Sequence, residues 1–166
     1  PPAQFLIKNP NRNVWTKDYL VPFLRHSSTA PRDYHGNIMV DELSEQELVK
    51  AKFVDLFTSK TDKFALNFTD FFGIAEQPNV PGTNDDERPE NWTLRLPSDY
   101  DENYYKSLAN FKNEYAINIP EILRMSLENR VDSGEIPCGR IHEARELINK
   151  LARWEQILKE PETTDK

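Results

Sequence analysis

The chain has 166 residues and a net charge of −7, with 28 acidic against 21 basic side chains. Its 37% hydrophobic content can supply a folded core, and its apolar runs are far shorter than the roughly 20 residues that cross a bilayer. Lys and Arg do not gather into the basic stripe that nucleic-acid binding requires. The composition therefore argues against a nucleic-acid partner and against a membrane partner.

Cysteine usage points to a reduced compartment. Cys138 is the single cysteine, so an internal disulfide and a cysteine-rich zinc site are both excluded. We therefore expect a cytoplasmic location. Because the chain begins with Pro1 and not with Met, we also expect it to be a segment of a longer polypeptide.

The first 40 residues contain several prolines, which break regular structure, and we interpret 1–40 as an irregular segment that wraps around the rest. The first firm element is a helix over 44–59. Ser44, followed three residues later by Glu47, is typical of a capping box, and apolar residues then recur at helical spacing. The apolar run 64–68 has the length of a short buried strand. A helix, a turn and a strand in this order indicate an α/β fold.

Residues 76–99 contain four prolines and Gly82, which predicts a long shaped loop. Three amphipathic helices are expected after it. The first begins at Asp99, the second runs from Pro120 to Gly134, and the third follows Gly139. The predicted apolar face of the first helix is Tyr104, Leu108, Phe111 and Tyr115. That of the second is Leu123, Leu127 and Val131, and that of the third is Ala144, Leu147, Leu151, Trp154 and Leu158. The polar tail 161–166 is expected to fray.

One stretch of the loop region carries a specific pattern. It reads Asp70-Phe71-Phe72-Gly73-Ile74, then Gln77-Pro78-Asn79-Val80-Pro81-Gly82-Thr83, then Pro89 and Asn91-Trp92-Thr93-Leu94-Arg95-Leu96. This order resembles the end of the 4-α-glucanotransferase (amylomaltase) family of glycoside hydrolases, in which a "QDLLGL" turn is followed by "N-x-PGT…PNWR-x-RL". The resemblance covers about residues 44–97. Thr69, Glu90 and Thr93 depart from the family's pattern, and Thr93 stands where the family has an Arg.

The resemblance implies a fold and a division of the chain. The fold class it implies is an α/β fragment: the terminal helix–strand step of a (β/α)8 barrel, followed by a mainly α-helical C-terminal extension. Residues 41–98 would then be the end of a barrel-like catalytic region with its Pro-rich site loop, and 99–160 the helical extension. Barrel active sites gather at the C-terminal ends of the strands, where the loop after Phe68 would lie.

The family resemblance also implies a substrate and a set of contacts. The partners would be an α-1,4-glucan or malto-oligosaccharide and the remainder of the same polypeptide, with no cofactor and no metal. Asn79 looks like the family's loop asparagine that hydrogen-bonds a sugar hydroxyl, and Trp92 and Asp70 are further candidates for substrate binding. Each has a structural alternative: Asn79 as a turn former, Trp92 as a core anchor and Asp70 as a helix N-cap.

Catalytic residues are not expected in this chain. Retaining transfer between glucans needs two carboxyl groups about 5–5.5 Å apart, and we find no pair placed by a motif to act as nucleophile and acid. The family also uses an Asp that follows a His. Here His26, His35 and His142 are followed by Ser, Gly and Glu. We therefore predict that the chain is inactive alone.

Four other residues are open to a chemical interpretation, and for each we favour a structural one. His26 and His35 lack partners at metal-ligand spacing, so surface or capping roles are expected. Cys138 is expected to be a buried or inert thiol, and Trp154 to pack in the core.

Two other functions remain open. Residues 99–159 could form a helical interaction or scaffolding module, which would have no need of the loop pattern. A noncatalytic glycan-binding domain would use Trp15, Trp92 and Tyr side chains as its platform.

Overall fold

The structure is a computed structural model that describes residues 18–61, 63, 65, 66, 72, 93, 95–109 and 116–160. Four α-helices and three 3-10 helices (η) make up the regular structure of this part. In chain order they are η1 (Val21–Leu24), η2 (Val40–Glu42), α3 (Glu45–Thr58), α5 (Tyr100–Ala109), α6 (Ile119–Asp132), η3 (Cys138–Arg140) and α7 (Ile141–Lys159).

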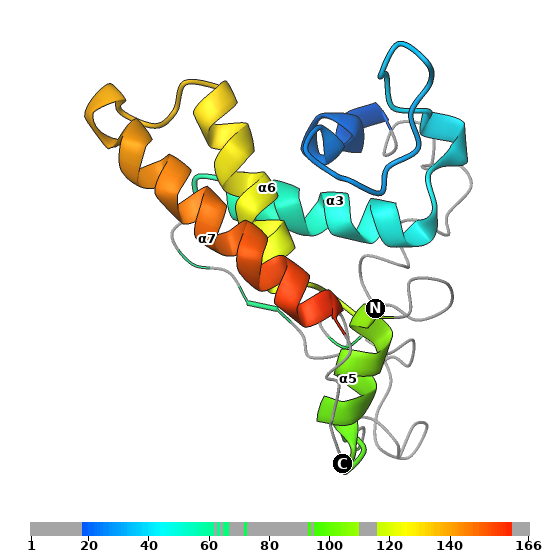
Figure 1. The fold of residues 1–166 in the computed structure, drawn as a ribbon. Coiled ribbons are helices and arrows are strands. Elements are labelled where there is room, and N and C mark those ends of the chain that lie inside the picture. The colour runs from blue at the N-terminus through cyan, green and yellow to red at the C-terminus, as the bar shows by residue number, and fades with distance from the viewer. Residues whose placement is uncertain are drawn as a thin grey trace.

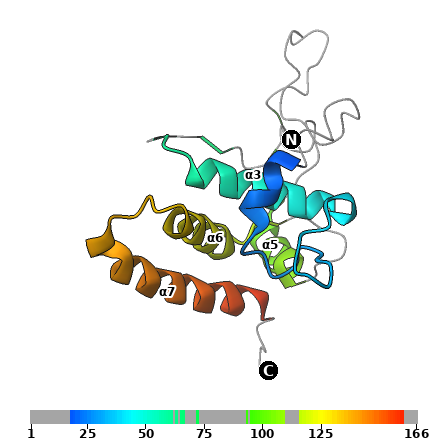
Figure 2. The same ribbon diagram turned by 90° about the horizontal axis from the view of Figure 1, so that it is seen from above.

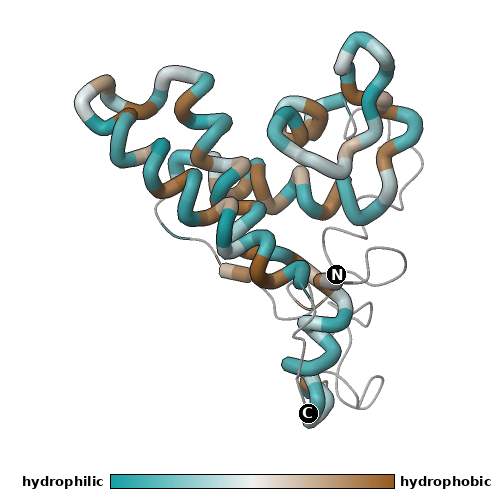
Figure 3. The backbone as a smooth tube through the Cα atoms, in the orientation of Figure 1, coloured by the Kyte–Doolittle hydropathy of each residue, from teal (hydrophilic) through white to brown (hydrophobic). Residues whose placement is uncertain are grey.

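Helix α6 is the centre of this arrangement. It packs side by side with α7, contacts α3 on another side, and also touches η1, which lies against α3 (Figures 1 and 2). Helix α5 contacts α7 near the C-terminal end of α7. Hydrophilic and apolar residues alternate along α7 in Figure 3, as they do on a helix that buries one side. Elements far apart in sequence therefore meet around α6.

Local sequence explains where α3 begins. The Ser44 hydroxyl accepts a hydrogen bond from the Glu47 backbone N–H at 3.2 Å, which confirms the predicted N-cap. Glu45 and Glu47 place negative charge in the first turn, where the helix dipole favours it. The Glu47 carboxylate hydrogen-bonds Ser27 and Thr29. The same residue that marks the helix start thus ties α3 to the segment after η1.

The two ends of α6 also follow from sequence. Asn118 accepts a hydrogen bond from the Glu121 N–H at 3.1 Å, and Pro120 lies in the first turn, where no intrahelical donor is lost. At the other end Gly134 has φ = 72°, a conformation that a side chain disfavours, and its N–H bonds the Val131 carbonyl. The chain then turns back through η3 into α7.

Apolar side chains of η1, α3 and α6 form one core. Its most buried members include Leu24, Val54 and Met125, and full burial of each such side chain contributes about 1.5–3 kcal/mol. The whole cluster is Leu20, Leu24, Ala30, Leu43, Leu48, Val49, Ala51, Phe53, Val54, Ile117, Ile122 and Met125. This core fixes the positions of the charged side chains that border it.

The prediction that the chain is an α/β fragment of a (β/α)8 barrel is wrong. The described part of the chain is helical and holds no strand, and a single isolated antiparallel bridge joins Arg32 and Ile38. Within the expected strand 64–68, Ala65 and Leu66 have irregular backbone and the remaining residues lie outside the described set. A short apolar run does not make a strand unless a neighbouring strand pairs with its backbone groups. Leu66 is 37% exposed, so its side chain does not enter a core.

The three helices predicted over 99–160 are confirmed as α5, α6 and α7, but the buried face of α6 differs from the predicted one. The residues that α6 buries are Glu121, Ile122, Met125 and Ser126. The predicted stripe is only half-buried: Leu123, Leu127 and Val131. Because α6 packs against α3 as well as α7, an interpretation that assumes one buried face misses the more buried side.

The predicted face of α7 is correct in part. Ala144 and Leu151 are buried as expected, whereas Leu147 and Trp154 are exposed. The prediction that Trp154 packs in the core is therefore wrong. The buried stripe of α7 includes Glu155, a charged residue that hydropathy patterning assigns to the surface.

Candidate functional site

Charged side chains from α3, α6 and α7 meet in one buried group beside the core. We call this group the ionic centre, and its members are Glu47, Lys50, Glu121, Arg124, Glu155 and Lys159. Each has a side chain at most 14% exposed. Buried ionised groups are costly unless paired, so the pairing within this group decides whether it is stable and what it can do.

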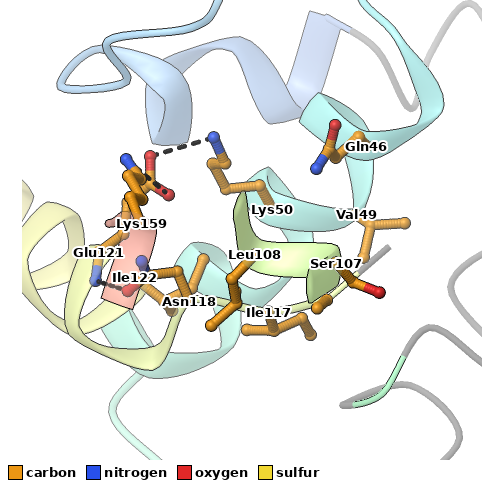
Figure 4. Close-up of a pocket in the computed structure, with 11 residues that line it drawn as sticks. Gln46, Val49, Lys50, Ser107, Leu108, Ile117, Asn118, Glu121, Ile122 and Lys159 are labelled. Atoms are coloured by element: carbon orange, nitrogen blue, oxygen red, sulfur yellow. Dashed lines mark hydrogen bonds and ion pairs between the residues drawn. The ribbon is translucent and has the colours of Figure 1, made fainter. Parts of the chain in front are cut away.

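Lys50 lies at the α3 side of the ionic centre. Its ammonium group donates to Thr29 Oγ1 at 2.8 Å, to Glu121 Oε1 at 3.0 Å and to Glu47 Oε1 at 3.4 Å. Figure 4 shows Lys50 reaching from α3 toward Glu121 on α6. An ammonium group has three hydrogens to donate, and here each has an acceptor.

Glu121 joins the three helices. Its carboxylate binds Lys50 through one oxygen and lies 3.7 Å from Lys159 Nζ through the other. Lys159, from the last turn of α7, also contacts Glu155 at 2.6 Å. The Asn118 side chain caps α6 and donates to the Glu155 carbonyl at 3.2 Å. One carboxylate thus holds cations from two neighbouring helices.

Arg124 connects α6 to α7 and continues the centre toward η1. Its Nε donates to Glu155 Oε2 and its Nη1 to Glu128 Oε2, each at 2.7 Å. Burial alone would lower the pKa of Arg124, but the hydrogen bond to Glu155 and the negative charges around it outweigh burial and raise that pKa. The guanidinium is therefore a permanent cation between two acids.

The pKa values of the two acids beside Arg124 are shifted in opposite directions. Burial raises the pKa of Glu155, yet hydrogen bonds from Arg124 and Lys159 outweigh burial and hold this pKa below 4.5. Burial is the dominant influence on Glu128 and raises its pKa above 4.5, although Arg124 and His26 oppose the rise. Arg124 and Lys159 together offset the burial of Glu155, whereas Arg124 and His26 offset the burial of Glu128 only in part.

His26 extends the charge pairing to the outer end of α6. Its Nε2 is 3.0 Å from Asp132 Oδ2 and its Nδ1 is 3.7 Å from Glu128 Oε2. Arg25 also reaches Asp132, at 3.7 Å. The expected surface or capping role of His26 becomes a bridging role between the segment after η1 and α6.

Helical spacing places these charges together. On α3, Glu47 and Lys50 are three residues apart; on α6, Arg124 and Glu128 are four apart; on α7, Glu155 and Lys159 are four apart. Residues at these spacings share a helix face. The sequence carries this signal, but it identifies only pairs within one helix and not the contacts between helices.

A small cavity borders the ionic centre. It has a volume of about 30 Å³ and is lined by residues that include Gln46, Lys50, Ser107, Asn118 and Glu121 (Figure 4). A water needs at least about 10–15 Å³ of such volume, so the cavity has room for one or two waters. Pockets for small molecules are typically about 300–1,000 Å³, so this cavity does not fit a sugar ring.

The contact between Thr29 and Lys50 is the closest approach to nucleophile geometry in this region. The Thr29 hydroxyl accepts a hydrogen bond from Lys50 and donates one to Glu47. A base that activates a hydroxyl must accept its proton. Lys50 is a donor and cannot act as that base; the Thr29 hydrogen is accepted by Glu47. The ion pairs of Lys50 with Glu121 and of Arg124 with Glu155 join different helices, so the ionic centre braces them.

The three residues predicted to bind substrate, Asn79, Trp92 and Asp70, lie outside the described residues, as does Trp15. The structure therefore leaves their roles as predictions.

Two other candidates have clear positions. His35 is exposed, with its ring 3.6 Å from that of Tyr34. Cys138 is exposed, so of the two expected alternatives the buried thiol is wrong and the inert thiol stays a prediction. Cys138 lies in η3, between α6 and α7.

No family model, curated protein or solved structure matches this chain. Among the side chains that the structure describes, no group of three or more His, Cys, Asp or Glu is arranged to hold a metal ion. The described helices include none with the length and apolar character needed to span a bilayer.

Proposed function

We propose that this chain is the C-terminal part of an α-glucan-transferring enzyme of the 4-α-glucanotransferase type. The observation that carries the proposal is the ordered pattern in the sequence: Asn79, then Pro81-Gly82-Thr83, then Asn91-Trp92. In this proposal the loop contacts sugar, helices α3 to α7 support it, and the catalytic carboxylates are elsewhere in the polypeptide.

The ionic centre is consistent with a supporting role for the helices. Glycosyl transfer needs one carboxylate free to attack the sugar and one acid free to protonate the leaving oxygen. Glu47, Glu121 and Glu155 each contact a cation, and their side chains are almost fully buried. Carboxylates held in this way stabilise the packing of helices and have no open face for a substrate.

Asn79 is the residue we propose for sugar contact. Pro78 and Pro81 restrict the backbone on both sides, which favours an amide held in place before the sugar arrives. An amide has both a donor and an acceptor, as a sugar hydroxyl does. Trp92 and Asp70 are proposed to complete the contact, Trp92 by stacking on a sugar ring.

The test compares Asn79→Ala with Asn84→Ala, a matched control five residues later in the same loop, both in the complete encoded polypeptide. The kcat/KM for maltotriose disproportionation and the thermal unfolding midpoint are measured side by side. We expect Asn79→Ala to weaken transition-state binding by about 1–3 kcal/mol, roughly a 5- to 150-fold loss, with little change in unfolding.

Two results would count against this proposal. A complete polypeptide without transfer activity would reject the function. An Asn79→Ala variant that matches Asn84→Ala in activity, or that loses activity only as far as it loses stability, would make Asn79 a turn former.

The proposal includes partners and a location. The partners are an α-1,4-glucan or malto-oligosaccharide and the remainder of the polypeptide. The proposed cytoplasmic location rests on the single cysteine, Cys138.

A second candidate, a noncatalytic helical interaction module, is favoured by one observation. Helix α7 exposes Leu147, Trp154 and Ile157, which are large apolar side chains. A helix that only braces a loop has no need of them.

A further inference from the structure

The ring of His26 faces two acidic side chains of α6 at once. Its Nε2 is 3.0 Å from Asp132 Oδ2, and its Nδ1 is 3.7 Å from Glu128 Oε2. The side chains of His26 and Glu128 are 24% and 20% exposed, whereas that of Asp132 is 41% exposed. Each ring nitrogen therefore has its own carboxylate, and Glu128 is the more buried of the two acids.

This arrangement needs one proton more than a neutral ring supplies. An ionised carboxylate only accepts hydrogen bonds, so the hydrogen on Nε2 belongs to the contact with Asp132. A neutral imidazole has a single N–H, which leaves a lone pair on Nδ1 beside the negative charge of Glu128. A proton on either Nδ1 or Glu128 converts this repulsion into an attraction.

Two arginines complete the charged surroundings of the ring. Arg124 Nη1 is 2.7 Å from Glu128 Oε2 and 3.5 Å from the His26 carbonyl oxygen, and Arg25 is 3.7 Å from Asp132. Both cations oppose a positive charge on His26. Burial raises the pKa of Glu128, which favours a proton on this acid. Because Nδ1 and Glu128 interact, the proton belongs to the pair and not to one residue.

His26 begins the segment that connects η1 to α3. Ser27 and Thr29 hydrogen-bond the Glu47 carboxylate of α3, and the Ala30 backbone N–H donates to the Ser27 hydroxyl at 3.2 Å. His26 thus ties to α6 the start of a segment whose next residues bind α3. A change at His26 acts on how this segment docks against the ionic centre.

We propose that His26 and Glu128 form a pH-sensitive clasp, in which one shared proton fastens the segment after η1 to α6. The folded chain binds this proton more tightly than the unfolded chain does. The stabilisation is therefore present at low pH and is lost as the pH rises through the titration of the folded pair. Imidazole groups change charge between about pH 5 and 8, so we expect the loss in the upper part of that range. This inference is independent of the proposed sugar contact.

Urea unfolding between about pH 6 and 8 compares the full chain with His26→Gln, which keeps a hydrogen-bond donor but cannot take up the proton. Relative to this variant, the unfolding equilibrium constant of the wild-type chain should fall about threefold from pH 8 to pH 6, the scale of a partly exposed ion pair. His35→Gln is the matched control, because His35 is exposed and its ring lies against Tyr34. This control should follow the wild-type chain at every pH.

Glu128→Gln tests the partner. It keeps the size of the side chain and removes the carboxylate, so it should abolish the same gain of stability on acidification from pH 8 to pH 6. Adding His26→Gln to it should change the pH dependence no further, because the two residues titrate as one unit.

Hydrogen exchange of the Ala30 amide reports on the segment itself. After correction for the intrinsic rate at each pH, exchange in the wild-type chain should slow about threefold from pH 8 to pH 6, relative to His26→Gln.

Three results would overturn the proposal. A constant ratio of the unfolding constants of the wild-type chain and His26→Gln would mean that the pair takes up no proton on folding. A gain that survives in Glu128→Gln would assign the proton to another contact of His26. Equal corrected exchange of Ala30 at both pH values would show that the proton does not hold the segment.

Discussion

Two lysine–glutamate contacts in this protein are chemically alike but lie in opposite surroundings. Lys50 is 3.0 Å from Glu121 in the ionic centre, with side chains 9% and 3% exposed. Lys106 is 2.6 Å from Glu102 on α5, with side chains 66% and 65% exposed. The shorter contact is the less important one, because water screens it and because both of its partners are well solvated when apart. Distance alone therefore does not rank ion pairs.

The buried pair teaches why the helices are held in one arrangement. Its members come from α3 and α6, whereas Lys106 and Glu102 belong to one turn of α5. Removing one buried partner leaves the other charge without compensation in a medium that solvates it poorly.

Glu121→Leu should be the most destabilising change, at about 3 kcal/mol or more in the free energy of unfolding, because it leaves Lys50 and Lys159 with one carboxylate fewer. Urea denaturation followed by circular dichroism measures the effect. The control is the double variant Glu121→Leu/Lys50→Met, which removes both charges and should recover part of the loss. A double variant as unstable as the sum of the two single changes would show that the pair is not coupled.

Arg124→Met should cost about 2 kcal/mol, since it removes the charged hydrogen bonds to Glu155 and Glu128 but keeps an apolar stem of similar length. Arg145→Met, on the exposed side of α7, is the matched control and should change little. The same denaturation experiment compares them. Equal effects of the two changes would mean that the buried position of Arg124 adds nothing.

The pH dependence of stability should reveal the opposite shifts of Glu155 and Glu128. Glu155 has a lowered pKa, so its contribution is present above pH 4.5 and is lost as the pH falls through the lower, folded value. Glu128 has a raised pKa, so protonation favours the folded state and stability is gained as the pH falls through that value.

Urea midpoints between pH 3 and 7 measure both effects. Glu155→Gln should flatten the loss of stability on acidification, and Glu128→Gln should make it steeper. If both variants shift the acid limb in the same direction, the assignment of the two pKa directions is incorrect.

Lys106→Ala should produce the smallest effect, within the error of a denaturation measurement, even though Glu102 raises the pKa of Lys106. The variant is compared with wild type at low salt and at 1 M NaCl. A clear loss of stability at low salt, absent at high salt, would contradict the ranking of the two contacts.

The sequence predicts the helices of this protein better than it predicts how they pack. Ser44, Asn118 and Gly134 mark helix ends because caps and positive φ angles depend on a few neighbouring residues. The interpretation of 64–68 as a strand was wrong because a short apolar run depends on what pairs with it. Helix ends can therefore be predicted from neighbouring residues, whereas contacts between residues far apart in the sequence cannot.

The same limit applies to the site. Hydropathy assigns Glu155 to the surface, yet it is buried. Arg124 of α6 and Lys159, four residues later on α7, pair with its carboxylate and neutralise it. Trp154 belongs to the core by hydropathy, yet it is exposed. Asn79, Trp92 and Asp70 rest on a sequence pattern and stay predictions.

The central claim is that the buried charges hold the helices together and take no part in chemistry. Glu121→Gln in the complete encoded polypeptide tests this claim most directly. Gln keeps the size of the side chain and removes its charge. The measurement is kcat/KM for maltotriose disproportionation per folded molecule, beside the thermal unfolding midpoint. We predict a lowered midpoint and an unchanged kcat/KM. A folded variant that loses transfer activity would contradict the account.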